Sequence, residues 1–359
     1  MLFKAQFFFL SAHWIVLLPS AFAAFKYVDS SCNDYGGITS GVQEAITALG
    51  MTYNALVQPQ LEPRVQRTLI SLFGAPSSPG QGQEWLAKLK SIYQTKYSLL
   101  GPSQSNAYVY CGDSIVWSTR MPDPDDEDCL DEFDPSEDNG AHCGVDVQER
   151  DNIAKDGKSI LGFWYAPNPH PDDEELPEGF DSPGEWVQLY GIDNPRRVPP
   201  GEPYCSVDGV EAVTIESGNS DWPSFILLCE DSFRPPADRP NWVNTNTNSE
   251  YWKQPRDLGA LLDAHQGSLS FHIMHEIGHA FEVSDDQRLP DGQLAHSWDE
   301  CAALAEVNHG RPVKENKAIE NCDSQAFFAI EQEIQQHLAR EVDSTNEIWA
   351  FSYQQVADS

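Results

Sequence analysis

The chain has 359 residues, and its 56 acidic side chains outnumber its 22 basic ones, which gives a formal net charge of −34 at pH 7. Such a surface repels the phosphates of nucleic acids and of anionic membranes, so the sequence excludes both as partners and favours cationic peptides. The length suits one large domain or two smaller ones.

The first 23 residues have the pattern of a secretory signal. Lys4 precedes a mostly apolar run from Phe7 to Leu18, and Ala21-Phe22-Ala23 then offers the small-x-small pattern at which signal peptides are cut. The apolar run is short for a membrane span. We therefore predict a signal peptide over residues 1–23 and a secreted mature chain over residues 24–359.

Cysteine usage agrees with export. All eight cysteines follow the predicted cleavage site, and an even number of cysteines in an exported chain indicates disulfides. No two cysteines have the Cys-x-x-Cys spacing, so a metal site made of cysteines is not expected. We predict that neighbours pair as Cys129–Cys143, Cys205–Cys229 and Cys301–Cys322.

The N-terminal part of the mature chain has the apolar pattern of helices. Apolar residues recur at helical intervals from Thr39 to Phe73, where Gly74 and Pro76 stop the pattern. A second helical stretch runs from about Gln83 to Leu99. We predict that residues 24–105 form a helical part of a single domain.

Short strands and acidic loops are expected over residues 106–232. Two acidic segments, 122–139 and 170–186, lack the ligand spacing and central glycine of a calcium loop, and we interpret them as solvated surface. The strand candidates are short apolar runs, namely Ala107 to Cys111, Ile115 to Ser118, Leu161 to Ala166, Trp186 to Tyr190 and Ser224 to Cys229.

A His-Glu-x-x-His motif, His275-Glu276-Ile277-Gly278-His279, lies inside an apolar helical segment. Residues four apart lie above one another on a helix, so the two imidazoles can share one metal ion. Zinc bound by histidines acidifies water, and a neighbouring carboxylate takes the proton. We predict His275 and His279 as metal ligands, Zn²⁺ as the cofactor and Glu276 as the general base. Histidines that are only solvated or hydrogen-bonded are the other interpretation of this short motif.

Two histidines need a third protein ligand, and three carboxylates compete for that position. Asp285 has the metzincin spacing, but Glu282 replaces the glycine that the metzincin turn needs. Glu300 has a thermolysin-like separation from the motif, but its helical pattern turns it away from the apolar face. Asp323 lies at the centre of the apolar face of a helical segment over residues 318–330, where an ionised carboxylate needs a cation. We predict Asp323 as the third ligand, and the alternative is a buried aspartate that caps a neighbouring loop.

The motif and the later stretch from Asn321 to Phe328, which reads Asn-x-Asp-Ser-x-Ala-x-Phe, resemble the deuterolysin-like aspzincin metallopeptidases. Within them, the likeness is to fungal secreted proteins that are similar to lysine-specific metallo-endopeptidases, and it covers residues 268–334 best. The resemblance implies a zincin-like α+β fold with a helical N-terminal part, a small mixed or antiparallel sheet, and an active-site helix followed by C-terminal helices over residues 260–345.

The same resemblance implies a zinc endopeptidase with His275, His279 and Asp323 as ligands and Glu276 as base. Its substrate would be a protein or peptide, with a preference for lysine or basic residues, and we expect a monomer. Gln325 stands where many relatives have tyrosine, and the strict signature Gly-Thr-x-Asp-x-x-Tyr-Gly is absent. The alternative function is therefore a secreted zinc-binding antigen or zinc-capture protein with little or no peptidase activity.

Overall fold

The structure, a computed structural model, is mixed α+β with small sheets and three disulfides. The predicted signal peptide and residues 170–185 of the second acidic loop lie outside the described residues. None of the helices in the described part of the chain is long and apolar enough to cross a membrane. The described residues are 25, 27–35, 37–99, 107–112, 115–123, 125–126, 128–136, 143–146, 154–155, 158–159, 163–168, 186–189, 204–206, 210–215, 224–233, 266–280 and 283–345.

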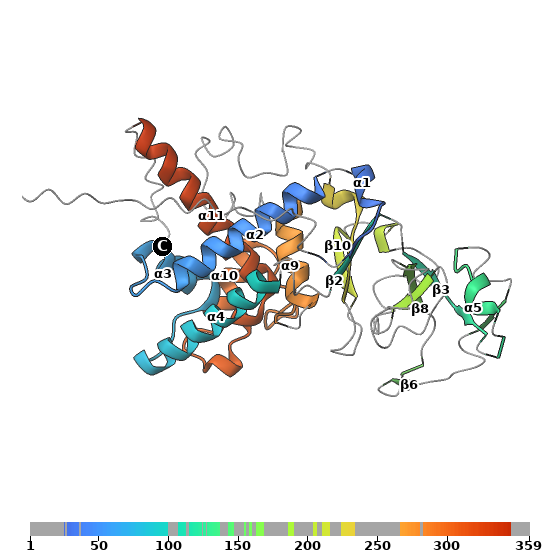
Figure 1. Ribbon diagram of the computed structural model, residues 1–359. Helices are drawn as coiled ribbons and strands as arrows, with labels where there is room; N and C mark the ends of the chain where they lie inside the picture. The colour runs from blue at the N-terminus through green and yellow to red at the C-terminus, as the bar shows by residue number, and fades with distance from the viewer. Residues whose placement is uncertain are drawn as a thin grey trace, which may run out of the picture.

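Helices gather at one end of the molecule, a four-stranded sheet lies in the middle, and smaller sheets lie beyond it (Figure 1). The longer helices are α2 (Ile38–Leu56), α3 (Pro63–Phe73), α4 (Pro79–Leu99), α9 (Leu269–Ala280), α10 (Trp298–Val307) and α11 (Cys322–Thr345). The short ones are α1 (Cys32–Tyr35), α5 (Cys129–Glu132) and the 3-10 turns η2 (Tyr204–Ser206), η3 (Glu230–Phe233), η4 (Val313–Glu315) and η5 (Lys317–Glu320).

The N-terminal part is helical, as predicted, but the pattern from Thr39 to Phe73 belongs to two helices rather than one. Pro63 occupies the first turn of α3, where its missing N–H is not needed. Gly74 ends α3 with a φ of 73°, and a Cβ atom there would lie 2.6 Å from the carbonyl oxygen of Ala305. Glycine at this position therefore lets α3 end against α10.

All five predicted strands are present, each within two residues of the predicted bounds. The strands are β1 (Tyr27–Val28), β2 (Ala107–Cys111), β3 (Val116–Ser118), β4 (Arg120–Pro122), β5 (Gly144–Asp146), β6 (Ala154–Lys155), β7 (Lys158–Ser159), β8 (Phe163–Pro167), β9 (Trp186–Leu189), β10 (Ala212–Ile215) and β11 (Ser224–Leu228). The four-stranded sheet has the order β1-β2-β11-β10, in which only β10 is antiparallel to its neighbour. Its edge strand β10 was not predicted.

This sheet separates two hydrophobic cores. Because side chains alternate along a strand, Val109 of β2 and Ile226 of β11 face the core that the helices share, while Tyr108 and Phe225 face a second core. The helical core draws on α2, α3, α4, α9 and α11 together. The predicted N-terminal part and the predicted catalytic helices therefore pack into one core. Within it, α9 contacts α2 and α11 as well as strands β10 and β11 of the sheet.

The disulfides confirm two predicted pairs and correct the third. Cys129–Cys143 and Cys205–Cys229 form, and Cys32 pairs with Cys111 across 79 residues. Cys301 and Cys322 remain thiols. Their sulfur atoms face different partners, since Cys301 Sγ lies 3.3 Å from the carbonyl oxygen of Ala295 and Cys322 Sγ lies 3.2 Å from Ser284 Oγ. Three disulfides fit an exported protein.

Candidate metal centre

Helix α9 presents the two histidines of the motif side by side. The ring centroids of His275 and His279 lie 4.9 Å apart, and their Nε2 atoms face each other at 3.1 Å. The opposite side of α9 is apolar, with Ile273, Met274 and Ile277 buried in the helical core. That burial fixes the rotation of the helix, so both imidazoles point to the other side, where 13% and 15% of their side-chain surfaces are exposed.

Asp286 completes a triangle with the two imidazoles. Its Oδ1 lies 3.3 Å from Nε2 of His275 and 3.3 Å from Nε2 of His279. Among the described residues this buried oxygen has no hydrogen-bond partner of good geometry. Tetrahedral zinc with ligands about 2.0–2.1 Å away needs ligand atoms roughly 3.3 Å apart. The residues present therefore fit a zinc ion, and their ligand atoms are already spaced for one.

The segment after α9 brings Asp286 to this position because it is tied to the start of α11. The backbone N–H of Asp285 donates to the carbonyl oxygen of Glu320 at 2.8 Å, and the N–H of Cys322 donates to the carbonyl oxygen of Asp285 at 3.2 Å. In addition, the side-chain oxygen of Asn321 accepts from the N–H of Gln287 at 3.1 Å. These bonds hold Asp286 against α9 although it lies outside any helix or strand.

Asp323, the predicted third ligand, lies beside the cluster and contacts His275. Its Oδ1 contacts Nδ1 of His275 at 3.2 Å, which is the ring nitrogen on the other side from the triangle. Its Oδ2 contacts Nδ1 of His296 at 2.7 Å. Asp323 is 2% exposed, as its place on the apolar face predicted. The carboxylate oxygen between the two Nε2 atoms belongs to Asp286, whereas Asp323 contacts the Nδ1 atoms of His275 and His296. Asp323 as a metal ligand stays a prediction.

The acidic groups of the cluster stabilise positive charge on the two imidazoles. Burial disfavours the charged form of His279, but the neighbouring Asp286 and Cys322 outweigh burial and raise its pKa to about 11. Burial acts likewise on His275, yet Asp323 and Asp286 raise its pKa well above the ordinary value. Burial also opposes the ionised form of Asp286, and the two imidazoles nevertheless hold the pKa of its carboxyl far below the usual range. In the metal-free protein, protons on the imidazoles supply charge that a metal cation can replace.

Glu276 reaches toward strand β10 rather than into the helical core. The hydroxyl of Thr214, on β10, donates to Glu276 Oε2 at 2.6 Å. Glu276 is 5% exposed. One turn earlier on α9, His272 contacts Glu211 just before β10, with 2.8 Å between Nε2 and Oε2. The two contacts join α9 to the edge of the sheet and fix the carboxylate of the motif.

The remaining candidates take structural positions. Glu300 forms a capping box with Ser297 at the start of α10, and its side chain also accepts from the N–H of His296 at 3.1 Å. Asp285 is 77% exposed at the side chain and lies 3.7 Å from Nδ1 of His279. Gln325 is buried, and its amide donates to the carbonyl oxygen of Ile319 at 2.7 Å. None of the three faces the triangle of ligand atoms.

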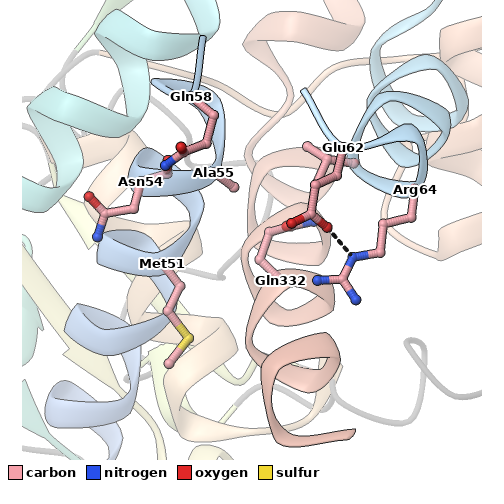
Figure 2. A pocket seen from close by; sticks show the side chains of 8 residues that line it. Met51, Asn54, Ala55, Gln58, Glu62, Arg64 and Gln332 are labelled. Atoms are coloured by element: carbon pink, nitrogen blue, oxygen red, sulfur yellow. Dashed lines mark hydrogen bonds and ion pairs between the residues drawn. The ribbon is translucent and has the colours of Figure 1, made fainter. Parts of the chain in front are cut away.

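A small pocket of about 170 Å³ lies elsewhere, between α2, α3 and α11. Figure 2 shows its lining, which includes the 3.1 Å ion pair between Arg64 and Glu62. Gln332, another lining residue, follows Asp323 by nine positions, or roughly 14 Å along α11. The lining contains no thiol or imidazole, so the pocket is separate from the metal cluster.

Sequence reasoning missed Asp286, Thr214 and the position of Cys322. The sequence signal for Asp286 is its place seven residues after His279, directly after Asp285, the residue with the metzincin spacing. No protein-family model, curated protein or solved structure matches the chain. The geometry of the cluster and the His-Glu-x-x-His motif are therefore the features that indicate a function.

Proposed function

We propose that the chain is a secreted zinc-dependent endopeptidase in which His275, His279 and Asp286 hold the metal. The observation that carries this proposal is the triangle of two Nε2 atoms and one carboxylate oxygen, with sides of 3.1, 3.3 and 3.3 Å. Glu276 is close enough to this triangle for its charge to help raise the pKa of His279. Asp323, which the sequence favoured as third ligand, then keeps the proton of His275 on Nδ1. With that proton on Nδ1, the lone pair of Nε2 faces the metal.

When bound, zinc supplies Lewis acidity, which acidifies water and polarises a carbonyl group. Glu276 takes the proton of the attacking water and delivers it to the leaving amine. Thr214 holds Oε2 of Glu276, which leaves the other oxygen of the carboxylate for the proton. His296, with 42% of its side chain exposed and Nδ1 held by Asp323, is placed to donate to the carbonyl oxygen of the substrate.

Strand β10 supports a peptide as the substrate. It is the edge strand of the four-stranded sheet within the described residues, and Thr214 connects it to Glu276. An extended peptide can pair with the open edge of a strand through backbone hydrogen bonds. Such pairing would lay a scissile bond next to α9. The net charge of −34 favours peptides with lysine or other basic residues.

A second function, zinc binding with little or no hydrolysis, is favoured by one observation. Gln325 occupies the position where the aspzincin resemblance implies a tyrosine, and its side chain is buried against the carbonyl oxygen of Ile319. It therefore provides no group that faces a substrate. In this case the cluster would hold zinc as a secreted zinc-capture protein.

Casein hydrolysis by the mature chain and by Glu276→Gln tests the peptidase proposal. Loss of a general base costs about 100- to 10,000-fold in rate. Glu276→Gln keeps the size of the side chain and spares the three ligands, so it should bind zinc as tightly as the wild type. The matched control is Glu306→Gln, an exposed residue of α10, which should cleave at the wild-type rate.

Two results would contradict the proposal. Hydrolysis by Glu276→Gln at the wild-type rate would remove Glu276 from the mechanism. A folded, zinc-loaded wild-type chain that does not cleave casein would instead support the zinc-capture function. The positions of the cuts then show whether cleavage occurs next to lysine.

A further inference from the structure

Cys322, the first residue of α11, is buried and carries a thiol. Its Sγ belongs to one group of donor atoms with His275, His279 and Asp286, and one ligand atom of each lies within 4.8 Å of the others. We propose that Cys322 is a fourth protein ligand, which closes the metal centre in the resting protein. This inference rests on the metal site of the proposed function.

The spacing of the four atoms suits a tetrahedral centre. With Zn–S of about 2.3 Å and Zn–N of about 2.0–2.1 Å, a sulfur and a nitrogen ligand lie roughly 3.6 Å apart. In the structure Sγ lies at most 4.8 Å from the other three ligand atoms. The three other atoms already have tetrahedral spacing, so small rotations of one side chain would complete the set.

The motif itself leaves space for the thiol. His275, Gly278 and His279 share one face of α9, because positions i, i+3 and i+4 are neighbours on a helix. A Cβ atom at Gly278 would lie 2.7 Å from Cys322 Sγ and 2.2 Å from Ser284 Oγ. Only glycine at this position lets the sulfur approach this face of the helix so closely.

Polar groups surround the thiol, whose sulfur is the atom that would bind zinc. Lys96 of α4 is fully buried, and its Nζ lies 2.9 Å from the same Cβ position at Gly278. The Lys96 ammonium donates to the carbonyl oxygen of Met274 at 3.1 Å. The Cys322 thiol donates to Ser284 Oγ at 3.2 Å. A buried cation and a hydroxyl therefore stand next to the sulfur.

A fourth protein ligand changes what the centre can do. Structural zinc sites have four protein ligands, whereas catalytic sites keep one position open for water. With Cys322 bound, the resting centre retains zinc tightly and has no open position. Hydrolysis then requires Sγ to leave, so Cys322 controls access of water to the metal.

Cobalt substitution tests the assignment without an activity measurement. The mature chain, Cys322→Ser, Cys322→Ala and the control Cys301→Ser are loaded anaerobically with one equivalent of Co²⁺. Metal content and absorption spectra are then measured. We expect a near-ultraviolet sulfur-to-cobalt charge-transfer band in the wild type and in Cys301→Ser, and no band in either Cys322 variant. Zinc affinity of the Cys322 variants should fall by more than the 10- to 100-fold that loss of an outer partner costs.

The outcomes separate this inference from the proposed function. Stoichiometric Co²⁺ binding by the wild type without the band, or a band that persists in both Cys322 variants, would overturn the fourth ligand and leave the three-ligand site intact. A wild type that binds no Co²⁺ or Zn²⁺ would overturn the metal site and the inference with it. Two different substitutions at Cys322 are made so that the test still holds if one of the two variants does not fold.

Discussion

Replacing each carboxylate near the motif in turn, and measuring zinc affinity, identifies which of them is the third metal ligand. The informative variants are Asp286→Asn and Asp323→Asn, which remove one negative charge each and keep the shape of the side chain. Asp285→Asn is the matched control, because Asp285 precedes Asp286 in the chain but is 77% exposed and lies 3.7 Å from His279. All three positions lie within the segments that the structure describes.

The expected losses of zinc affinity differ because the contacts differ. Zinc binding worth about 10–16 kcal/mol for four ligands corresponds to roughly 2.5–4 kcal/mol for each ligand. Asp286→Asn should therefore weaken zinc about 100- to 1000-fold, since 1.4 kcal/mol is a factor of ten. Of the three proposed ligands, Asp323 contacts only His275, through Nδ1, and loss of such an orienting partner costs about 10- to 100-fold. Asp285→Asn should change affinity little.

Competition against a chromophoric zinc chelator at pH 7.5 or so measures all the dissociation constants in one format. Circular dichroism of the metal-free variants checks that each one is folded. A larger loss for Asp323→Asn than for Asp286→Asn would refute the geometric reasoning and restore the ligand set that the sequence predicted. If Asp286→Asn lowers zinc affinity as little as Asp285→Asn does, neither carboxylate binds the metal.

Two further predictions concern the base and the metal-free protein. Thr214→Val removes the hydroxyl that donates to Glu276 at 2.6 Å. Because a hydrogen bond to a charged group is worth about 1.5–3 kcal/mol, kcat on a peptide should fall about 10- to 100-fold while zinc affinity stays unchanged. A parallel loss of zinc affinity would contradict this prediction. The raised pKa of His279, about 11 against 6.5, stabilises the metal-free fold fully below pH 6.5 and progressively less up to pH 11. The Tm measured in chelator should therefore fall between pH 6 and pH 9 more for the wild type than for Asp286→Asn, and equal slopes would refute it.

Much of the secondary structure could be predicted from the sequence because it depends on local patterns. The strand Ala107–Cys111 is buried on both faces, so its apolar run stands out. Strand β10 was missed because Ala212–Ile215 is only four residues long and half-buried at a sheet edge. The break between α2 and α3 was missed because apolar spacing alone does not show where a helix stops.

Only the part of the site that lies on a single helix could be predicted from sequence spacing. Spacing along α9 placed His275 and His279 together, but Asp286 comes from a segment without regular structure. Its position depends on hydrogen bonds between Asp285 and residues 320 and 322, and such long-range contacts leave no periodic signal. The Cys301–Cys322 pairing was wrong for a related reason, since proximity in sequence does not reveal which way two buried thiols point.

The bridge between Cys32 and Cys111 closes a covalent ring of 79 residues around α2, α3 and α4. By the chain-entropy estimate, a ring of that length destabilises the unfolded state by about 4.5 kcal/mol. A proteolytic cut inside the ring would leave one species on a non-reducing gel and two after reduction. A single maturation cut there could not release the N-terminal helices, so Lys96 on α4 would stay next to α9 in the nicked chain.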